Sequence, residues 1–153
     1  MKSILKKMKI SDKTTYEKVK LIHDYIVNNT TYDTTYTKYN AYDALIHKTS
    51  VCQGYSLLAY KMLSEAGVPV RIITGIGDGE SHAWNIVKIG KVWYNLDCTW
   101  DDPITNTKKP VIQYDYFLKN EKDFKNHKRD AKFTTKSFKQ KHPMAKKSYS
   151  LKK

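Results

Sequence analysis

Three side chains that could together perform acyl transfer occur in the chain in the order Cys52, His82, Asp97. A thiolate attacks carbonyl carbon well, a neighbouring imidazole can accept and return the proton, and a carboxylate can hold that imidazole in the useful tautomer. Each of these residues alone is more often structural than catalytic. Together, in compatible local structures, they predict a thiol-dependent acyl-transfer enzyme.

Cys52 falls where a helix should begin. Thr49 and Ser50 are residue types that cap helix N-termini, and Gly67 followed by Val68-Pro69 stops the helix. A thiol in the first turn faces unpaired backbone N–H groups and the positive end of the helix dipole, which can lower its pKa toward neutrality. The same N–H groups could stabilise an oxyanion beside the sulfur. The apolar residues between the two signals recur at helical spacing: Tyr55, Leu58, Ala59, Met62 and Ala66.

His82 and Asp97 fall on the two arms of a predicted β-hairpin. Residues 82–89 (HAWNIVKI) and 92–98 (VWYNLDC) are strand-like and meet at Gly90-Lys91. A two-residue turn with glycine first is the type II′ arrangement. The hairpin therefore brings the imidazole and the carboxylate into the same small region.

The register of the hairpin decides whether the two side chains can meet. A turn at Gly90-Lys91 pairs Ile89 with Val92 and sets His82 diagonal to Asp97 on one face of the hairpin. A turn at Ile89-Gly90 would set His82 directly opposite Asp97, although isoleucine tolerates positive φ poorly. Either even loop keeps both side chains on one face, whereas a one-residue slip would separate them.

The remaining segments are predicted from the same rules. The glycine-rich stretch 77–80 precedes a strand rather than a helix, so we interpret it as a flexible turn presenting His82 and not as a phosphate loop. Residues 134–153 are expected to be frayed or extended. The other predicted elements are a helix over about 12–28 with a Thr14–Glu17 capping box and Val19, Ile22 and Ile26 facing inward, an ordered loop over Asn28–Asn40, a short helix over 41–46 and a strand over Val70–Ile76.

The stretch AYDALIHKTSVCQGYSLLAYKMLSEAGVPVRIITG, continued by SHAWNIVKIGKVWYNLDCTWDDP, resembles the core of the bacterial transglutaminase-like superfamily. The flanking segments LIHDYIVNNTTYD and YDYFLKNEKDFKNH resemble the surroundings of that core, so the similarity covers roughly residues 15–130. It implies an α+β, papain-like fold, with the nucleophile helix packed on an antiparallel sheet. It also implies that Cys52 is the nucleophile, His82 the general base and acid, and Asp97 the orienting residue.

The resemblance defines the site better than the substrate, because the family includes cross-linking transferases, peptidases, amidases and members that have lost activity. The first hypothesis is therefore acyl transfer on a protein or peptide amide through a Cys thioester, either cross-linking or hydrolysis, with a cell-wall peptide among the possible substrates. The alternative is a catalytically silent binding or scaffold domain. We expect one domain over 1–133, with its core at about 12–130, followed by a basic C-terminal tail over 134–153.

Several residues near the triad are candidates for supporting roles. Trp84 and Trp100 could form a wall of the site, and Tyr42 or Gln53 could donate to an oxyanion. Papain-like enzymes have a polar residue six positions before the cysteine, where this chain has Ile46, so the second donor stays open. The structural alternatives are core packing for Trp93, a small buried apolar role for Cys98, and turn capping rather than calcium binding for Asp101-Asp102.

The charge of the chain is unevenly distributed. The formal net charge is +13, and residues 119–153 hold 13 basic and 3 acidic residues, whereas residues 11–118 hold 11 basic and 12 acidic ones. A basic C-terminus could attract an anionic surface or simply favour solubility, and no specific nucleic-acid-binding module is visible. No apolar run is long enough to span a membrane. The sequence predicts no cofactor and no metal site, and the localisation stays open between export, if a signal segment was removed, and the cytoplasm.

Overall fold

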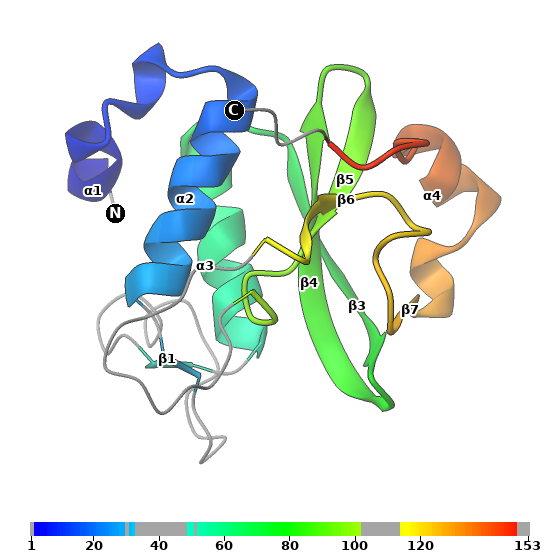
Figure 1. Cartoon of the computed structure of the whole chain (residues 1–153). Helices are drawn as coiled ribbons and strands as arrows, with labels where there is room; N and C mark the ends of the chain where they lie inside the picture. The colour runs from blue at the N-terminus through cyan, green and yellow to red at the C-terminus, as the bar shows by residue number, and fades with distance from the viewer. Residues whose placement is uncertain (1, 30, 33–48, 51, 102–113, 150–153) are drawn as a thin grey trace.

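The computed structural model describes residues 2–29, 31–32, 49–50, 52–101 and 114–149 (Figure 1). Two helices, α2 (Thr15–Asn29) and α3 (Cys52–Glu65), cover one side of a five-stranded antiparallel sheet. The sheet has the strand order β6-β5-β4-β3-β7. This mixed arrangement confirms the predicted α+β class. The strands are β3 (Val70–Gly77), β4 (Glu80–Ile89), β5 (Val92–Leu96), β6 (Phe117–Lys119) and β7 (His127–Arg129).

The smaller elements flank this core. At the N-terminus, α1 (Lys2–Lys7) and the 3-10 helix η1 (Ile10–Asp12) precede α2. The two-residue strands β1 (Thr31–Tyr32) and β2 (Thr49–Ser50) pair in parallel. On the other side of the sheet lie the 3-10 helix η3 (Ala131–Phe133) and α4 (Lys136–Lys141).

The predicted capping box begins α2. The backbone N–H of Thr14 donates to Glu17 Oε1 at 3.1 Å, and the N–H of Glu17 donates to Thr14 Oγ1 at 3.2 Å. These reciprocal bonds satisfy two N–H groups that the first turn of a helix leaves unpaired. The three residues predicted to face inward, Val19, Ile22 and Ile26, are buried.

The helix that carries Cys52 at its first position ends as the sequence predicts. Gly67 has a φ of +83°, and its N–H donates to the carbonyl of Ser64 at 3.0 Å. The N–H of Val68 donates to the carbonyl of Leu63 at 2.9 Å, which completes a Schellman motif. The apolar positions predicted from helical spacing are all buried: Tyr55, Leu58, Ala59, Met62 and Ala66.

Two tight turns set the register of the central strands. Asp78 and Gly79 both have positive φ, as a type I′ turn requires, so the turn expected before β4 is a compact two-residue hairpin turn. Between β4 and β5 only the first turn residue, Gly90, has positive φ, which fits a type II′ turn. Ile89 pairs with Val92, which confirms the predicted register.

The sheet is buried on both faces. The face toward α2 and α3 includes Val70, Val87 and Leu96, packed against residues such as Leu58 and Met62. A second cluster contains Ile73, Trp84, Ile86, Trp93, Phe124 and Phe133. Trp93 belongs to this core, and Cys98 is buried as predicted.

The expectation of a frayed segment from residue 134 onward is wrong for the described residues 134–149. Trp93 N–H donates to the carbonyl of Pro143 at 2.8 Å, and Ala145 N–H donates to the carbonyl of Trp93 at 2.9 Å. Farther on, the ring of Tyr149 stacks on that of Tyr16 with centroids 4.7 Å apart. The lysines of this segment suggested exposure, but the apolar residues between them pack against the sheet.

Some predictions concern segments that lie largely or wholly outside the described residues. These are the short helix over 41–46 and most of the loop over Asn28–Asn40. Within the described ranges, no helix is long and apolar enough to cross a membrane.

Candidate active site

The hairpin brings His82 and Asp97 into contact. His82 lies near the start of β4 and Asp97 directly follows β5, and the two bond through His82 Nε2 and Asp97 Oδ2 at 2.6 Å. Both side chains are buried. Gly77 makes room for the imidazole, since a Cβ at this position would lie 2.8 Å from His82 Cδ2. The pair therefore depends on both tight turns.

Both carboxylate oxygens of Asp97 have hydrogen-bond partners. Its Oδ1 accepts the backbone N–H of Trp100 at 3.0 Å, and its Oδ2 lies close to two imidazoles, 2.6 Å from His82 Nε2 and 2.8 Å from His127 Nε2. Burial raises the pKa of Asp97, but the hydrogen bonds from His127 and His82 outweigh it and hold the pKa below its usual range. The carboxylate form is thus favoured between two imidazoles.

His127 was not among the predicted site residues. This residue begins β7, at the opposite edge of the sheet from β5 and β6, and its ring crosses to Asp97. Its other nitrogen, Nδ1, lies 2.8 Å from the backbone carbonyl of Lys125. The residue lies in the segment YDYFLKNEKDFKNH that resembles the family, but neither strand parity nor helical spacing connects it to Asp97.

Aromatic rings surround both imidazoles. Trp100 stacks on His82 with centroids 5.0 Å apart and lies 4.2 Å from His127, and Trp84 lies 5.8 Å and 4.8 Å from the same two rings. Phe124 stacks on His127 at 3.8 Å. The two tryptophans predicted as wall candidates therefore enclose the histidine–aspartate group.

The structure places the other predicted site residues only in part. Cys52 is the first residue of α3, and this helix packs on β4, which carries His82. The side chains of Cys52 and Gln53, and the whole of Tyr42, lie outside what the structure describes.

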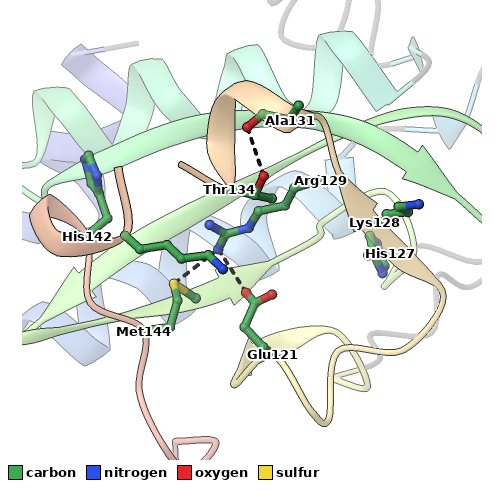
Figure 2. A pocket seen from close by; sticks show the side chains of 9 residues that line it. Glu121, His127, Lys128, Arg129, Ala131, Thr134, His142 and Met144 are labelled. Carbon is green, nitrogen blue, oxygen red and sulfur yellow. Dashed lines mark hydrogen bonds and ion pairs between the residues drawn. The ribbon is translucent and has the colours of Figure 1, made fainter. Parts of the chain in front are cut away.

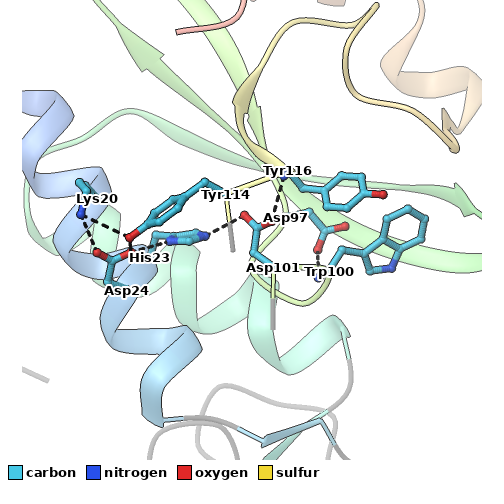
Figure 3. Close-up of polar contacts among 8 residues, drawn as sticks. All are labelled: Lys20, His23, Asp24, Asp97, Trp100, Asp101, Tyr114 and Tyr116. Atoms are coloured by element: carbon cyan, nitrogen blue, oxygen red, sulfur yellow. Dashed lines mark hydrogen bonds and ion pairs between the residues drawn. The ribbon is translucent and has the colours of Figure 1, made fainter. Parts of the chain in front are cut away.

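A second polar network joins α2 to the turn that follows β5 (Figure 3). His23 is fully buried, with Nδ1 2.9 Å from Asp24 Oδ1 and Nε2 2.8 Å from Asp101 Oδ2. Asp101 Oδ1 also accepts the N–H of Tyr116 at 2.9 Å. Asp101 is thus a bridge to α2, and our interpretation as a simple turn cap was wrong.

The ionisation of this network reflects its burial. Burial raises the pKa of Asp101 to about 6, against the lowering effect of the hydrogen bond from His23. Burial lowers the pKa of His23, but the carboxylates of Asp101 and Asp24 outweigh it and raise the pKa above its usual range. The network carries Lys20 and Tyr114 on its exposed side, both bonded to Asp24.

A basic cavity of about 700 Å³ lies beside β7, with His127 in its lining (Figure 2). Figure 2 shows the guanidinium of Arg129 between Glu121 and Met144, and Arg129 Nη2 lies 2.9 Å from Glu121 Oε1. Lys128 and Lys139 add positive charge to the lining. His127 therefore lies beside this cavity and contacts Asp97, with its own side chain buried.

One group among the described residues has donor atoms close enough together to hold a metal ion. It consists of His82, Asp97 and His127, whose ligand atoms lie within 4.8 Å of one another. The nitrogen–oxygen separations of 2.6 and 2.8 Å are hydrogen-bond lengths. As arranged, the group is a hydrogen-bonded trio.

Comparisons with known proteins show what the chain as a whole is similar to. The chain is similar to a protein described as a TGase (25% identity, TM-score 0.54, covering 63% of this chain and 29% of the other). It is also similar to a candidate cysteine protease from Cytophaga hutchinsonii (25% identity, TM-score 0.51, covering 63% and 35%). Calcium-bound LapG from Legionella pneumophila shares the fold at 13% identity (TM-score 0.54, covering 79% and 66%).

The chain spans about a third of the length of the first two of these proteins. A search of curated proteins gave no significant match. The model of the transglutaminase-like superfamily matches residues 2–98, which is more than half of the sequence. The chain therefore belongs to the transglutaminase-like superfamily.

Proposed function

We propose that Cys52, His82 and Asp97 form the catalytic triad of a thiol-dependent acyl transfer on protein or peptide amides. The observation that carries this proposal is the 2.6 Å contact between His82 Nε2 and Asp97 Oδ2. A carboxylate on Nε2 favours the tautomer with its proton on that nitrogen, which leaves Nδ1 as the basic atom for a thiol. Membership of the superfamily supports a general thiol-dependent activity.

In the proposed reaction the thiol of Cys52 gives its proton to His82 Nδ1, and the thiolate attacks the amide carbonyl carbon. The tetrahedral intermediate then expels the amine, which takes the proton from His82, so that the C–N bond breaks and a thioester remains. Backbone N–H groups at the start of α3 are suited to stabilise the oxyanion. Asp97 keeps its negative charge throughout and stabilises the imidazolium of His82.

The fate of the thioester decides between two reactions of one class. Attack by water gives hydrolysis, and attack by a primary amine gives a cross-linked product, with His82 removing the proton in both cases. A site that excludes water favours the amine, and the rings of Trp84 and Trp100 beside His82 provide apolar surface for that purpose. The similar structures include both a TGase and a candidate cysteine protease, so the partner of the thioester is the first thing to measure.

The test uses a glutamine-containing peptide offered with and without a biotinylated primary amine. Intact-mass spectrometry follows the acyl-enzyme, and product analysis separates transfer to the amine from transfer to water. Cys52→Ala should abolish both products, whereas Cys98→Ala, as the matched control, should retain them. An acyl-enzyme that persists in the Cys52→Ala variant, or none in the wild type with any of a panel of peptide amides, would reject the proposal in favour of a silent binding domain.

A further inference from the structure

Two histidines from different strands share one oxygen of Asp97. His82 comes from β4 and His127 from β7, and their Nε2 atoms lie 2.6 and 2.8 Å from Asp97 Oδ2. Their ring centroids are 5.4 Å apart. A triad needs only one imidazole on its carboxylate, so the second one requires its own explanation.

Both ring nitrogens of His127 face hydrogen-bond acceptors. Its Nε2 faces the Asp97 carboxylate, and its Nδ1 faces the carbonyl oxygen of Lys125 at 2.8 Å. Both neighbours are acceptors, and a neutral imidazole has one N–H only. The doubly protonated ring donates to both neighbours, whereas either neutral tautomer would set a lone pair against an acceptor oxygen.

We propose that His127 is a positioning residue for the triad, which fixes the Asp97 carboxylate by a charged hydrogen bond and limits how strongly Asp97 holds a proton on His82. The inference rests on the proposed function, because His82 is taken there as the base. A positive charge on the far side of Asp97 offsets part of the negative potential that His82 feels. His82 then releases its proton to the leaving amine more readily than it would beside an uncompensated carboxylate.

The surroundings of His127 allow such coupling. Its side chain is 2% exposed and Phe124, Trp100 and Trp84 pack against its ring, so water screens the charge weakly.

The charged and titratable groups around it come from four directions. Asp97 and Asp101 follow β5, and the ring of Tyr116 lies 5.6 Å from His127. His82 faces it from β4. On the strand of His127 itself, Lys128 follows, and Arg129 is paired with Glu121 at the edge of the cavity. Among these described groups, Asp97 is the one that contacts both imidazoles through a single atom, Oδ2.

Three full-length variants separate the hydrogen bond from the charge. His127→Gln keeps an N–H donor for Asp97 but removes the charge, and His127→Phe removes both while retaining an aromatic ring in the aromatic surroundings. His142→Gln is the matched control, since His142 is also a buried histidine but bonds to the carbonyl of Phe138 at 3.0 Å, away from Asp97.

The decisive measurement is an NMR titration of the His82 ring in a Cys52→Ala background, where the thiol cannot contribute. We expect the midpoint of His82 to move up by about one pH unit in His127→Gln, as loss of a like charge at this separation predicts. The His142→Gln control should leave it unchanged. With Cys52 intact, the rate of acyl-enzyme formation should fall about tenfold or more in His127→Phe. The loss should be smaller in His127→Gln, which keeps a donor for Asp97.

An unshifted His82 midpoint in a folded His127→Gln protein would overturn the proposal, as would an equal shift in His142→Gln. If a variant fails to fold, the nitrogen NMR spectrum of the wild-type protein gives the test instead. A neutral His127 ring at pH 7 in that spectrum would contradict the proposed charged hydrogen bond to Asp97. The NMR titration of His82 does not require the protein to be catalytically active. A shifted midpoint without any acyl-enzyme would therefore reject the proposed function and leave the coupling of the two histidines in place.

Discussion

Replacement of Asp97 by asparagine should separate catalysis from stability. Asp97 accepts three hydrogen bonds, from Trp100 N–H and from the Nε2 atoms of His82 and His127. In Asp97→Asn the amide oxygen can still accept from Trp100, while the NH₂ group faces the two imidazoles. Its two hydrogens then force both Nε2 atoms to accept. For His82 the proton moves to Nδ1, the nitrogen that the proposed mechanism needs as a base.

The magnitudes follow from these exchanges. Two charge-assisted hydrogen bonds, each contributing about 1.5–3 kcal/mol, become two neutral ones of about 0.5–1.5 kcal/mol. The net loss is about 2–3 kcal/mol before the lower cost of burying an amide instead of a carboxylate is counted, so the fall in Tm should not exceed about 4–12 °C. Asp97→Ala instead leaves three donors without an acceptor and should cost about 3–5 kcal/mol. The asparagine variant is thus the more stable of the two.

Although Asp97→Asn should be more stable than Asp97→Ala, its activity should be lower than, or at most equal to, that of Asp97→Ala. The wrong tautomer should reduce acyl-enzyme formation about 10⁴-fold in Asp97→Asn, whereas Asp97→Ala leaves His82 able to adopt either tautomer and should cost about 10²–10⁴-fold. Thermal melts and intact-mass kinetics on both variants test this pattern. An Asp97→Asn protein that forms acyl-enzyme at the wild-type rate would refute the assignment of Asp97 as the orienting residue.

The pH dependence gives a second check on Asp97. Its pKa is lowered in the folded protein. The stability that it contributes is therefore present above its unfolded value of about 4 and is lost as the pH falls through the folded value. The difference in Tm between the wild type and Asp97→Asn should narrow in that acidic range, and a constant difference would mean that ionisation of Asp97 does not stabilise the fold.

Three further outcomes are expected. Truncation after residue 133 should lower Tm by several degrees, because it removes the backbone hydrogen bonds between Trp93 and residues 143–145. An unchanged Tm would mean that the removed segment does not pack on the sheet. Iodoacetamide at neutral pH should label Cys52 before Cys98, which is 3% exposed, and peptide mapping that finds equal rates would argue against an activated thiol. Because the folded pKa of Asp101 is raised to about 6, the folded state binds that proton more tightly, so wild-type stability should fall by up to about 3 kcal/mol as the pH rises from about 4 to 6. The raised pKa of His23 extends this fall above pH 6.5, and Tm curves of Asp101→Asn that run parallel to the wild type would exclude the effect.

The parts of the fold that depend on local rules could be predicted from the sequence. The Thr14–Glu17 capping box, the end of α3 at Gly67 and the turn at Gly90 each involve residues a few positions apart, and their geometry follows from backbone preferences. The contact between His82 and Asp97 also belongs here, because strand parity and an even turn bring them together.

The parts that depend on distant pairing could not be predicted. His127 reaches Asp97 only because β7 pairs with β3 at the far edge of the sheet, and no periodicity connects residues 30 positions apart. The segment after residue 133 was misjudged for a similar reason. Its lysines gave a signal of exposure, while the packing of Phe138 and Met144 depends on a sheet face that the rest of the chain builds.

The turn after β5 connects these distant parts. Asp97 binds the imidazoles from β4 and β7, and the backbone N–H of Asp101 donates to the carbonyl of Asp97 at 3.2 Å. The Asp101 carboxylate in turn bonds to His23 of α2. A carboxylate that must orient an imidazole needs a fixed backbone, and this one is held from a helix, from two strands and from its own turn. The precision of the candidate triad is therefore a property of the assembled sheet and of α2, rather than of the hairpin from which His82 and Asp97 come.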